Sequence, residues 1–402
     1  MSEVWTAAAL PLEARRRFRS VLTWARGVRR RPVWSSFAPS PWATVGERKA
    51  GDSVARVTLQ TIADRVGVSR MTVSNAFSRP NQLSPALREK ILAAASDLGY
   101  VGPDPAARAL ARGASGAVGF LLTESIGFAF NDQVSTQLLG AIADELSPTG
   151  LALTLLTSSG PGDLIPARDV AMDGALVYSC DPESPAVSYL LQRKLPIVLI
   201  DQDPVDDIPG VNVADREGAR TAAQHLIDLG HRRIGLAMSG LRGPQGLLED
   251  PREDVGGYAS RERLRGWLDA LDAAGIVPVA TRQRNDSVEE TAAAARLLLD
   301  RDDRPTAVLC FSDVIALRLI QSARTMGIRV PKDLSVVGFD DHPLAGTFRP
   351  ALTTVRQDVH AKGRAAAEAL TAALRGAEVP EPHVVLPAEL VIRDSTAPPP
   401  PA

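Results

Sequence analysis

The segment from Val57 to Ser78 restricts the fold of this 402-residue chain more than any other part of it. Its apolar residues recur with helical spacing in two short runs, which are separated by a turn at residues 67–69 (Gly-Val-Ser). Thr58 and Ser69 precede the two runs, and their side chains are suited to accept hydrogen bonds from the free N–H groups of a helix start. Two short helices joined by such a turn form a helix-turn-helix, whose second helix fits the major groove of DNA.

A third amphipathic run follows and completes a small helical unit. Ser84 is its predicted cap, Pro85 occupies the first helical position, and Gly99 ends it. Because two helices of this length do not fold alone, the third run is needed to close the core. We therefore predict a three-helix DNA-binding head over residues 53–102.

The polar residues of the second run lie where contacts with DNA require them. Hydroxyl groups suit phosphate contacts, and arginine and asparagine form bidentate pairs with guanine and adenine. An alanine-rich hairpin without a role in DNA binding is the alternative, but its exposed face would more often carry Glu/Lys pairs. The outward-facing residues are Ser69, Arg70, Thr72, Ser74 and Asn75.

Several short motifs of residues 57–113 resemble the head and hinge of the LacI-type (lactose/galactose repressor) transcription regulators. They are Val-Thr-Leu-x-x-Ile-Ala at 57–63, Gly-Val-Ser-x-x-Thr-Val-Ser at 67–74, Leu-Gly-Tyr at 98–100 and Ala-Ala-Arg-Ala-Leu at 106–110.

The resemblance implies a role for each matching residue. Arg70, Met71 and Asn75 would read bases, and residues 103–115 would form a hinge helix whose leucine, Leu110, enters the minor groove. Asn75 stands where arginine is common in the family, which indicates adenine in the operator where guanine is usual. The complete predicted DNA-binding set is Thr58, Ser69, Arg70, Met71, Thr72, Ser74, Asn75, Ala107 and Leu110.

Charge is distributed unevenly along the chain. The total of −2 combines +7 in residues 1–56, +3 in residues 57–113 and −12 in the remainder. A basic end on an acidic body directs one end of the molecule toward a polyanion. Residues 1–52 are arginine-rich and contain no apolar run of the kind a signal peptide needs, so we expect a disordered basic leader, with a DNA-binding arm as the alternative.

Residues from 116 onward alternate between short apolar runs and helical patterns, which predicts an α/β fold with doubly wound parallel sheets. The predicted strands are Ala117–Leu122, Ala152–Leu156, Gly174–Val177, Ile197–Ile200, Ile234–Met238, Ala307–Cys310 and Ser335–Phe339. The predicted helices are Val134–Leu146, Ala186–Lys194, Arg216–Leu229, Arg261–Ala274, Val288–Asp300, Asp313–Met326 and Val359–Leu374.

This length is too great for one simple sheet, so two lobes are expected. The first would take residues 116–213 and 353–380, the second would take 214–352 and 381–396, and a disordered proline-rich tail would follow at 397–402. Motifs such as Leu-Gly-His-Arg-Arg-Ile at 229–234 and Val-Val-Gly-Phe-Asp-Asp at 336–341 are similar to the two-lobed, periplasmic-binding-protein-like effector domain of LacI-type regulators.

Ligands of such sheets bind beyond the carboxyl ends of the strands. The resemblance implies that Arg263 holds the effector, that Asp340 contacts its hydroxyl groups, and that the pair Ser312 and Asp313 reaches the same cleft. The segment that follows the first predicted strand could complete the site, because one of its aromatic rings could stack on the effector. The residues of this segment are Phe128, Phe130 and Asp132. A guanidinium and a carboxylate together suit vicinal hydroxyls of a sugar or a nucleoside.

Each of these assignments has a structural alternative. Asp340 and Asp341 could cap the following segment, Arg263 could be a surface arginine, and the two phenylalanines could belong to the core.

Other classes of protein fit the sequence less well. A Gly-x-Ser-x-Gly elbow, a phosphate-binding loop and a His-Glu-x-x-His motif are all missing from the sequence. His225 and His231 lie six residues apart, off a common helical face, so no metal site and no cofactor are predicted. Cys180 and Cys310 each end an apolar run, which indicates small buried residues in a reducing compartment.

We therefore predict a cytoplasmic, homodimeric transcription regulator, most often a repressor in this family, and not an enzyme. It would bind a palindromic double-stranded operator under control of a small-molecule effector, without membrane contact. A periplasmic solute-binding protein would share the lobes but has no use for the head. A sugar-metabolising enzyme would need a catalytic base poised in the cleft.

Overall fold

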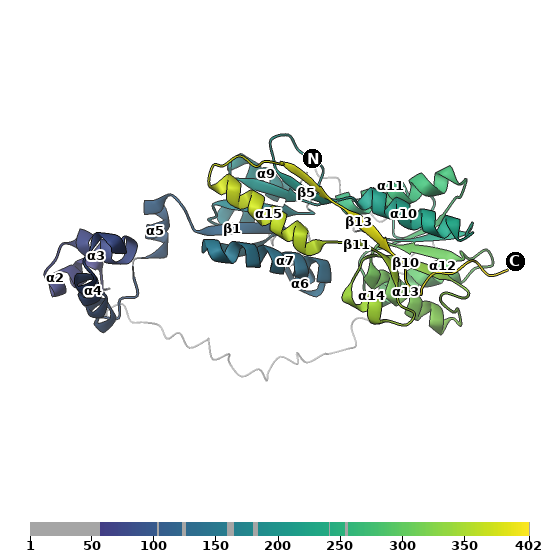
Figure 1. The fold of residues 1–402 in the computed structure, drawn as a ribbon, viewed down its shortest axis with the longest axis horizontal. Coiled ribbons are helices and arrows are strands. Elements are labelled where there is room, and N and C mark those ends of the chain that lie inside the picture. Colours follow the sequence, from purple (N-terminus) through teal and green to yellow (C-terminus); the bar gives the residue numbers. More distant parts are fainter. Residues whose placement is uncertain are drawn as a thin grey trace, which may run out of the picture. The chain divides into compact units, whose positions relative to one another are not determined.

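The computed structural model describes residues 57–102, 104–122, 126–158, 165–179, 184–240, 242–253 and 256–401 (Figure 1). The chain divides into two compact units, one before residue 104 and one from Asp104 onward. The predicted leader, the first residues of the predicted head (53–56) and Cys180 lie outside the described residues.

The first unit is the predicted three-helix head. Its helices are α2 (Leu59–Val66), α3 (Arg70–Ser78) and α4 (Pro85–Asp97), with a 3-10 turn at Pro80–Gln82. The three predicted caps are confirmed, since the side chains of Thr58, Ser69 and Ser84 each accept a hydrogen bond from a backbone N–H three residues later. Gly67 ends α2 with a φ of +79°, a left-handed conformation that glycine adopts without strain.

The core of the head is small and built from all three helices. Phe77 of α3 and Tyr100, which follows α4, close its edge with their rings 5.7 Å apart in an edge-to-face arrangement. Arg88 of α4 donates through Nε to the backbone oxygen of Ala76 at 3.3 Å and so ties α4 to α3. The buried core residues are Ile62, Ala63, Val73, Ala76, Ile91 and Ala95.

The second unit begins with α5 (Pro105–Arg112) and then forms two lobes, each built on its own sheet (Figure 1). The first sheet has six strands in the order β12-β5-β4-β3-β1-β2, and all neighbouring pairs are parallel. Its strands are β1 (Ala117–Leu122), β2 (Ala152–Thr157), β3 (Gly174–Tyr178), β4 (Ile197–Ile200), β5 (Gly210–Val213) and β12 (His383–Leu386). Its helices are α6 (Ile126–Asn131), α7 (Gln133–Leu146), α8 (Pro166–Asp169), α9 (Pro185–Gln192) and α15 (Val359–Leu374), with a 3-10 turn at Ser147–Thr149.

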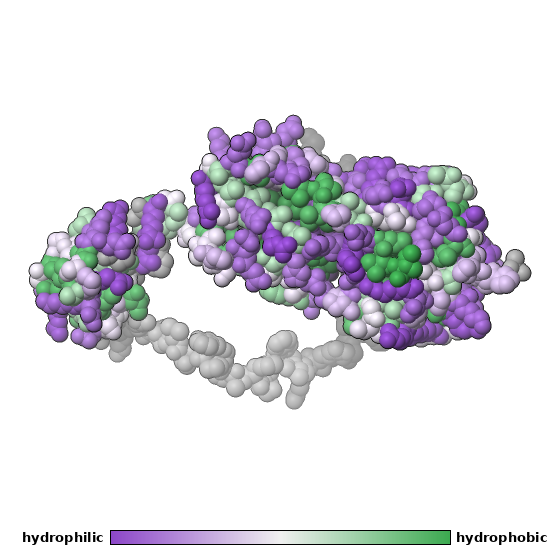
Figure 2. Space-filling view, in the orientation of Figure 1, coloured by the Kyte–Doolittle hydropathy of each residue, from purple (hydrophilic) through white to green (hydrophobic). Residues whose placement is uncertain are grey.

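The second sheet has seven strands in the order β13-β11-β10-β9-β6-β8-β7, of which β13 and β7 run antiparallel to their neighbours. Its strands are β6 (Ile234–Ser239), β7 (Gly246–Leu248), β8 (Val279–Gln283), β9 (Ala307–Cys310), β10 (Ser335–Asp340), β11 (Thr353–Gln357) and β13 (Ala388–Val391). Its helices are α10 (Asp215–Asp228), α11 (Tyr258–Ala273), α12 (Val288–Leu299), α13 (Asp313–Thr325) and α14 (Pro343–Thr347). In Figure 2 polar residues cover most of the visible face of the lobes, with apolar patches between them.

Two C-terminal strands belong to the opposite lobe from the one predicted. Residues 353–357, expected in the first lobe, form β11 in the second sheet, between β10 and the edge strand β13. Residues 383–386, expected in the second lobe, form β12 at the edge of the first sheet, beside β5. The chain therefore crosses between the lobes as many times as predicted, but its last two crossings come a few residues later, after β11 and after β12.

The prediction of a disordered tail is wrong for its first residue. The backbone oxygen of Ala397 accepts hydrogen bonds from Nε2 of His231 at 2.9 Å and from Oγ of Ser335, also at 2.9 Å. His231 is buried, and its other ring nitrogen lies 2.8 Å from Oγ1 of Thr306. Because a carbonyl oxygen only accepts, Nε2 carries the proton and Nδ1 accepts from the threonine. Burial lowers the pKa of His231, which favours this neutral form.

Gly266 lies where α11 packs against α10, and we expect Gly266→Ala to destabilise the second lobe. A Cβ at this position would overlap the backbone oxygen of Arg216 and lie 2.9 Å from Cβ of Ala219. Overpacking of this kind costs roughly 1–3 kcal/mol. Urea unfolding of the two variants measures the difference, with Gly140→Ala in α7 as the control, because a Cβ at Gly140 would meet nothing within 4 Å. Equal unfolding midpoints for both variants would contradict the packing argument.

Candidate functional site

The predicted base readers lie on the surface of α3. Arg70 is exposed, Met71 is 69% exposed and Asn75 is partly exposed. Among the described residues, no intramolecular hydrogen bond is recorded for the side chain of Arg70 or Asn75. A side chain without internal partners at the start of a recognition helix is available to base edges.

The hydroxyl side chains of the head also stabilise its helices. Oγ of Ser69 lies 2.8 Å from Oγ1 of Thr72 and accepts from the backbone N–H of the same residue at 3.0 Å. Thr58 forms a capping box with Thr61. Ser74 is partly exposed, and its backbone oxygen accepts from Oγ of Ser78 at 2.8 Å. These caps fix the ends of α2 and α3, where backbone N–H groups face outward.

The predicted hinge helix is formed as α5. Asp104 caps it, Pro105 occupies its first position, and Gly113 ends it with a φ of +68°. Leu110 is 87% exposed, and Ala107 is exposed on the same helix. An exposed leucine on so short a helix has no packing role in the second unit.

Strained backbone marks the carboxyl ends of three parallel strands in the two lobes. Ser179, Asp201, Asp340 and Asp341 all have positive φ values, between +48° and +110°, although none is glycine. They end or follow β3, β4 and β10. Non-glycine residues in this conformation cost free energy and gather at binding sites, and the carboxyl ends of parallel strands are where ligands of this fold class bind.

Arg263 of α11 is the centre of the polar cluster at this place. The residue is 4% exposed, and its Nε donates to Oδ1 of Asp215 at 2.8 Å. One terminal nitrogen donates to the backbone oxygen of Phe311 at 2.6 Å, and the other to Oδ1 of Asp340 at 3.3 Å. The guanidinium lies over the ring of Phe339, 3.6 Å from its centroid. The alternative of a surface arginine is therefore wrong.

The charge of Arg263 is set by its neighbours. Burial opposes the charged form, but the carboxylates of Asp215 and Asp340 outweigh it and raise the pKa of Arg263. Burial raises the pKa of Asp340 to about 6, against the opposing effects of Arg263 and of the amide of Gln357. A carboxyl group whose pKa is raised in this way is common at binding sites.

The residues predicted after β1 lie in α6 and at the start of α7. Asp132 caps α7 through the backbone N–H of Ser135 at 2.7 Å, and its charge raises the pKa of Asp340. It therefore acts on the same site from the first lobe. Phe130 is 62% exposed, so the core alternative is wrong for it. Phe128 lies in the same helix.

The polar pair after β9 divides into two roles. Ser312 is partly exposed and caps α13 by accepting from the backbone N–H of Ile315. Asp313 is fully buried, and its two oxygens accept from Oγ1 of Thr354 and from the backbone N–H of His342. Through these bonds Asp313 ties α13 to β11 and to the segment after β10. Asp341 has a similar structural role, pairing with Arg356 and Arg393 at 2.7 and 2.6 Å.

Sequence reasoning missed Lys362 and Gln357, which link the cluster to Asp201 in the first lobe. Nζ of Lys362 donates to Oδ2 of Asp201 at 2.6 Å and to Oε1 of Gln357 at 3.0 Å. Nε2 of Gln357 donates to Oδ1 of Asp340 at 2.7 Å. A second contact between the lobes joins Arg261 of α11 to Asp203, which follows β4, at 2.6 Å.

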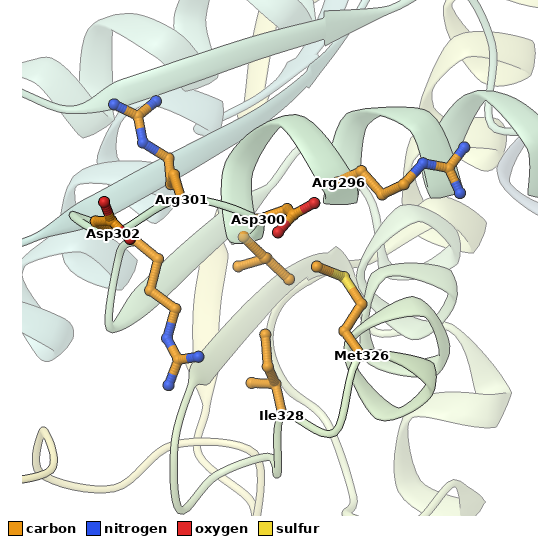
Figure 3. Close-up of a pocket in the computed structure, with 8 residues that line it drawn as sticks. Arg296, Asp300, Arg301, Asp302, Met326 and Ile328 are labelled. Atoms are coloured by element: carbon orange, nitrogen blue, oxygen red, sulfur yellow. The ribbon is translucent and has the colours of Figure 1, made fainter.

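A pocket of about 800 Å³ lies elsewhere on the second lobe (Figure 3). Its lining residues come from the end of α12 and from the segments that precede β9 and β10. This is the amino end of the sheet, opposite the edge at which parallel strands present ligand sites, so the pocket is separate from the Arg263 cluster. The residues labelled in Figure 3 are Arg296, Asp300, Arg301, Asp302, Met326 and Ile328.

Comparison with known proteins agrees with both units. Residues 58–102 match the family model of bacterial regulatory proteins of the lacI family, and residues 223–396 match that of the periplasmic binding protein-like domain. An HTH-type transcriptional regulator from Mycolicibacterium smegmatis is 37% identical over 334 residues, which are 78% of this chain and 90% of the relative. The chain belongs to the LacI family of bacterial regulatory proteins. It is therefore a transcriptional regulator of the helix-turn-helix type, as the sequence predicted.

Other members of the family resemble the chain along most of its length. The HTH-type transcriptional regulator IpsA of Corynebacterium glutamicum is 36% identical, covering 82% of this chain and 94% of the relative. The Lac repressor dimer bound to operator and the anti-inducer ONPF superimposes with a TM-score of 0.67 at 26% identity, covering 85% of this chain and 99% of the repressor chain. The CelR–cellobiose complex gives a TM-score of 0.60 at 30% identity, covering 85% and 100% of the two chains. None of the helices in the described residues combines the length and hydropathy needed to cross a membrane.

Proposed function

We propose that this regulator binds a palindromic operator as a homodimer and represses transcription, and that a small polyhydroxylated effector bound at Arg263 and Asp340 controls its affinity for DNA. One observation carries the proposal: a helix-turn-helix head with accessible polar side chains on its second helix is joined to a domain whose two lobes share one polar cluster at the carboxyl ends of their strands. The related Lac repressor structure contains a dimer, an operator and an anti-inducer, and the related CelR structure contains cellobiose.

The charge of the cluster selects the class of effector. The carboxylates of Asp132, Asp201, Asp215 and Asp340 outnumber the cationic groups of Arg263 and Lys362. Their field extends to Tyr258 at the start of α11, whose pKa rises to about 12 through burial and through nearby acidic groups that include Asp201 and Asp215. An excess of negative charge repels a phosphate group. A neutral sugar or nucleoside therefore fits, and its phosphorylated form does not.

The effector would act by shifting a population between two arrangements of the lobes. It changes operator affinity only if it binds one arrangement more tightly than the other. The contacts that join the lobes, Arg261 with Asp203 and Lys362 with Gln357, are the ones whose strength differs between such arrangements. No catalytic step and no cofactor are needed, and the protein would work in the cytoplasm, where its DNA lies.

Selection of bound duplexes from random DNA tests the first half of the proposal, and repetition with neutral sugars, nucleosides and their phosphates tests the second. We expect a palindromic site and a response to a neutral compound alone. A chain that shows no preference among duplexes at moderate salt, with or without these compounds, would contradict the proposed function.

Asp340→Asn should abolish the response to the active compound and leave operator affinity without it unchanged. The amide keeps the shape of the side chain but removes the negative charge that holds effector hydroxyls and balances Arg263. Operator titrations by fluorescence anisotropy, with and without the compound, measure both effects. Asp303→Asn is the matched control, because Asp303 is an exposed residue that pairs only with Arg301 among the described residues. A normal response from Asp340→Asn would show that the effector binds elsewhere.

A further inference from the structure

Lys362 is a buried lysine at the junction of the two lobes. It belongs to α15, which packs on the first sheet, and it is 1% exposed. Its ammonium group donates to Asp201 at 2.6 Å and to Gln357 at 3.0 Å. Removing an ammonium group from water costs several kcal/mol unless it is paired. A buried lysine therefore destabilises the fold unless its partners compensate for the lost hydration.

Gln357 carries the contact from the first lobe to the second. Its Oε1 accepts from the ammonium group, which has donors only, and this fixes the orientation of the amide. Nε2 then faces Oδ1 of Asp340 and donates to it at 2.7 Å. The hydrogen bonds form one series that runs from Asp201 through Lys362, Gln357 and Asp340 to Arg263.

Neutralising Asp201 does not by itself explain the lysine. Oδ1 of Asp201 is buried and has no hydrogen-bond partner among the described residues, so the pair leaves the first lobe with an unsatisfied oxygen. Two aliphatic residues of similar volume would fill the same space without removing charges from water. The feature that only the lysine supplies is the ammonium contact with Gln357, which in turn holds Asp340.

We propose that Lys362 is a positioning residue that acts through Gln357 to keep the Asp340 carboxylate ionised and oriented toward the effector. The inference rests on the proposed function, in which Asp340 receives the effector. It makes the state of an effector-binding group in the second lobe dependent on a helix of the first lobe.

The charges around Asp340 agree with this role. Burial raises its pKa to about 6, and Asp132 of α7 adds to the rise. Arg263, Gln357 and Lys362 all lower the pKa. Asp313 of α13 and Tyr178 of β3 are further neighbours, and their own pKa values are raised by burial and further by Asp340. Lys362 itself faces Asp201, Asp215 and the ring of Tyr178.

The test is the titration of Asp340 in the full-length protein without DNA or effector. Aspartate labelled with ¹³C at the carboxyl group is followed by NMR, and Asp340→Asn identifies the resonance. In Lys362→Met the midpoint should move upward by about one pH unit, because Gln357 loses the ammonium contact that holds its amide toward Asp340 and the attraction of the cation is lost as well. Lys332→Met, which changes an exposed lysine of the second lobe, should leave the midpoint unchanged. An unchanged midpoint in Lys362→Met overturns the proposal.

Two further variants separate positioning from a purely structural role. Lys362→Met combined with Asp201→Asn removes both buried charges, so it remains the deciding variant if Lys362→Met alone does not fold. An upward movement is again expected, smaller than in Lys362→Met because a nearby anion is lost together with the cation. In a Gln357→Met background, Lys362→Met should move the midpoint much less, because the contact that transmits its effect is gone. An equal movement in both backgrounds would show that the lysine acts only through space. Neither measurement uses operator or effector, so failure of the proposed function would leave both results standing.

Discussion

Arg263→Ala should lower the free energy of unfolding of the two-lobed unit by roughly 3–5 kcal/mol, the cost of removing one partner from a buried ion pair. The residue is 4% exposed, and its guanidinium satisfies Asp215, Asp340 and the backbone oxygen of Phe311. Alanine would leave a buried carboxylate, Asp215, without the cation that balances it. The proposed effector site therefore also stabilises the fold.

Urea unfolding followed by far-UV circular dichroism measures this loss. Arg265→Ala is the matched control, because Arg265 lies two residues away on the same helix, is 52% exposed and pairs only with Glu262 among the described residues. Exposed pairs of this kind contribute about 0–1 kcal/mol. Equal unfolding midpoints for Arg263→Ala and Arg265→Ala would mean that the buried network stabilises nothing. Arg263→Ala is for the same reason a poor probe of effector binding, and Asp340→Asn is the better one.

The sequence predicts buried parallel strands well because they read as continuous apolar runs. The bounds of β1, β4 and β9 agree with the prediction at both ends. It predicts poorly the strands that carry buried polar residues, such as β5 with Asn212 and β8 with Arg282 and Gln283. The sequence also did not predict the short edge strands β7, β12 and β13. Three or four residues are too few to show the alternation of apolar and polar residues that marks an edge strand.

The residues of the candidate site also divide into those that the sequence predicted and those that it did not. The resemblance to the family singled out Arg263 and Asp340 as candidate residues, and the structure brings them together. Lys362 was not predicted as part of the site, because a lysine in an amphipathic helix is normally exposed. Its position was nevertheless a signal: Val359, Ala366 and Leu370 line the buried face of α15, and Lys362 falls on that face at a spacing of three and four residues. A charged residue on a buried stripe indicates a partner from another segment, but the sequence does not show which one.

Arg70→Ala and Asn75→Ala should each weaken operator binding by roughly 1–3 kcal/mol and relax the base preference at one position of each half-site. Both side chains extend from the exposed side of α3, and no internal hydrogen bond among the described residues competes for them. Lys90→Ala is the control, because this exposed residue lies on α4, away from the recognition helix. If Lys90 contacts a phosphate, its loss would lower the affinity for all duplexes about equally, without changing which bases are preferred.

Asn75→Arg gives the sharper outcome, since it exchanges one base preference for another. Asparagine pairs in a bidentate manner with adenine, and arginine with guanine, so the variant should prefer guanine where the parent protein prefers adenine. Selections from random duplexes, carried out with both proteins at one fixed salt concentration, compare the two preferences directly. If both proteins recover the same site, Asn75 does not read a base, and the specificity of the head comes from other residues of α3 or from the shape of the DNA.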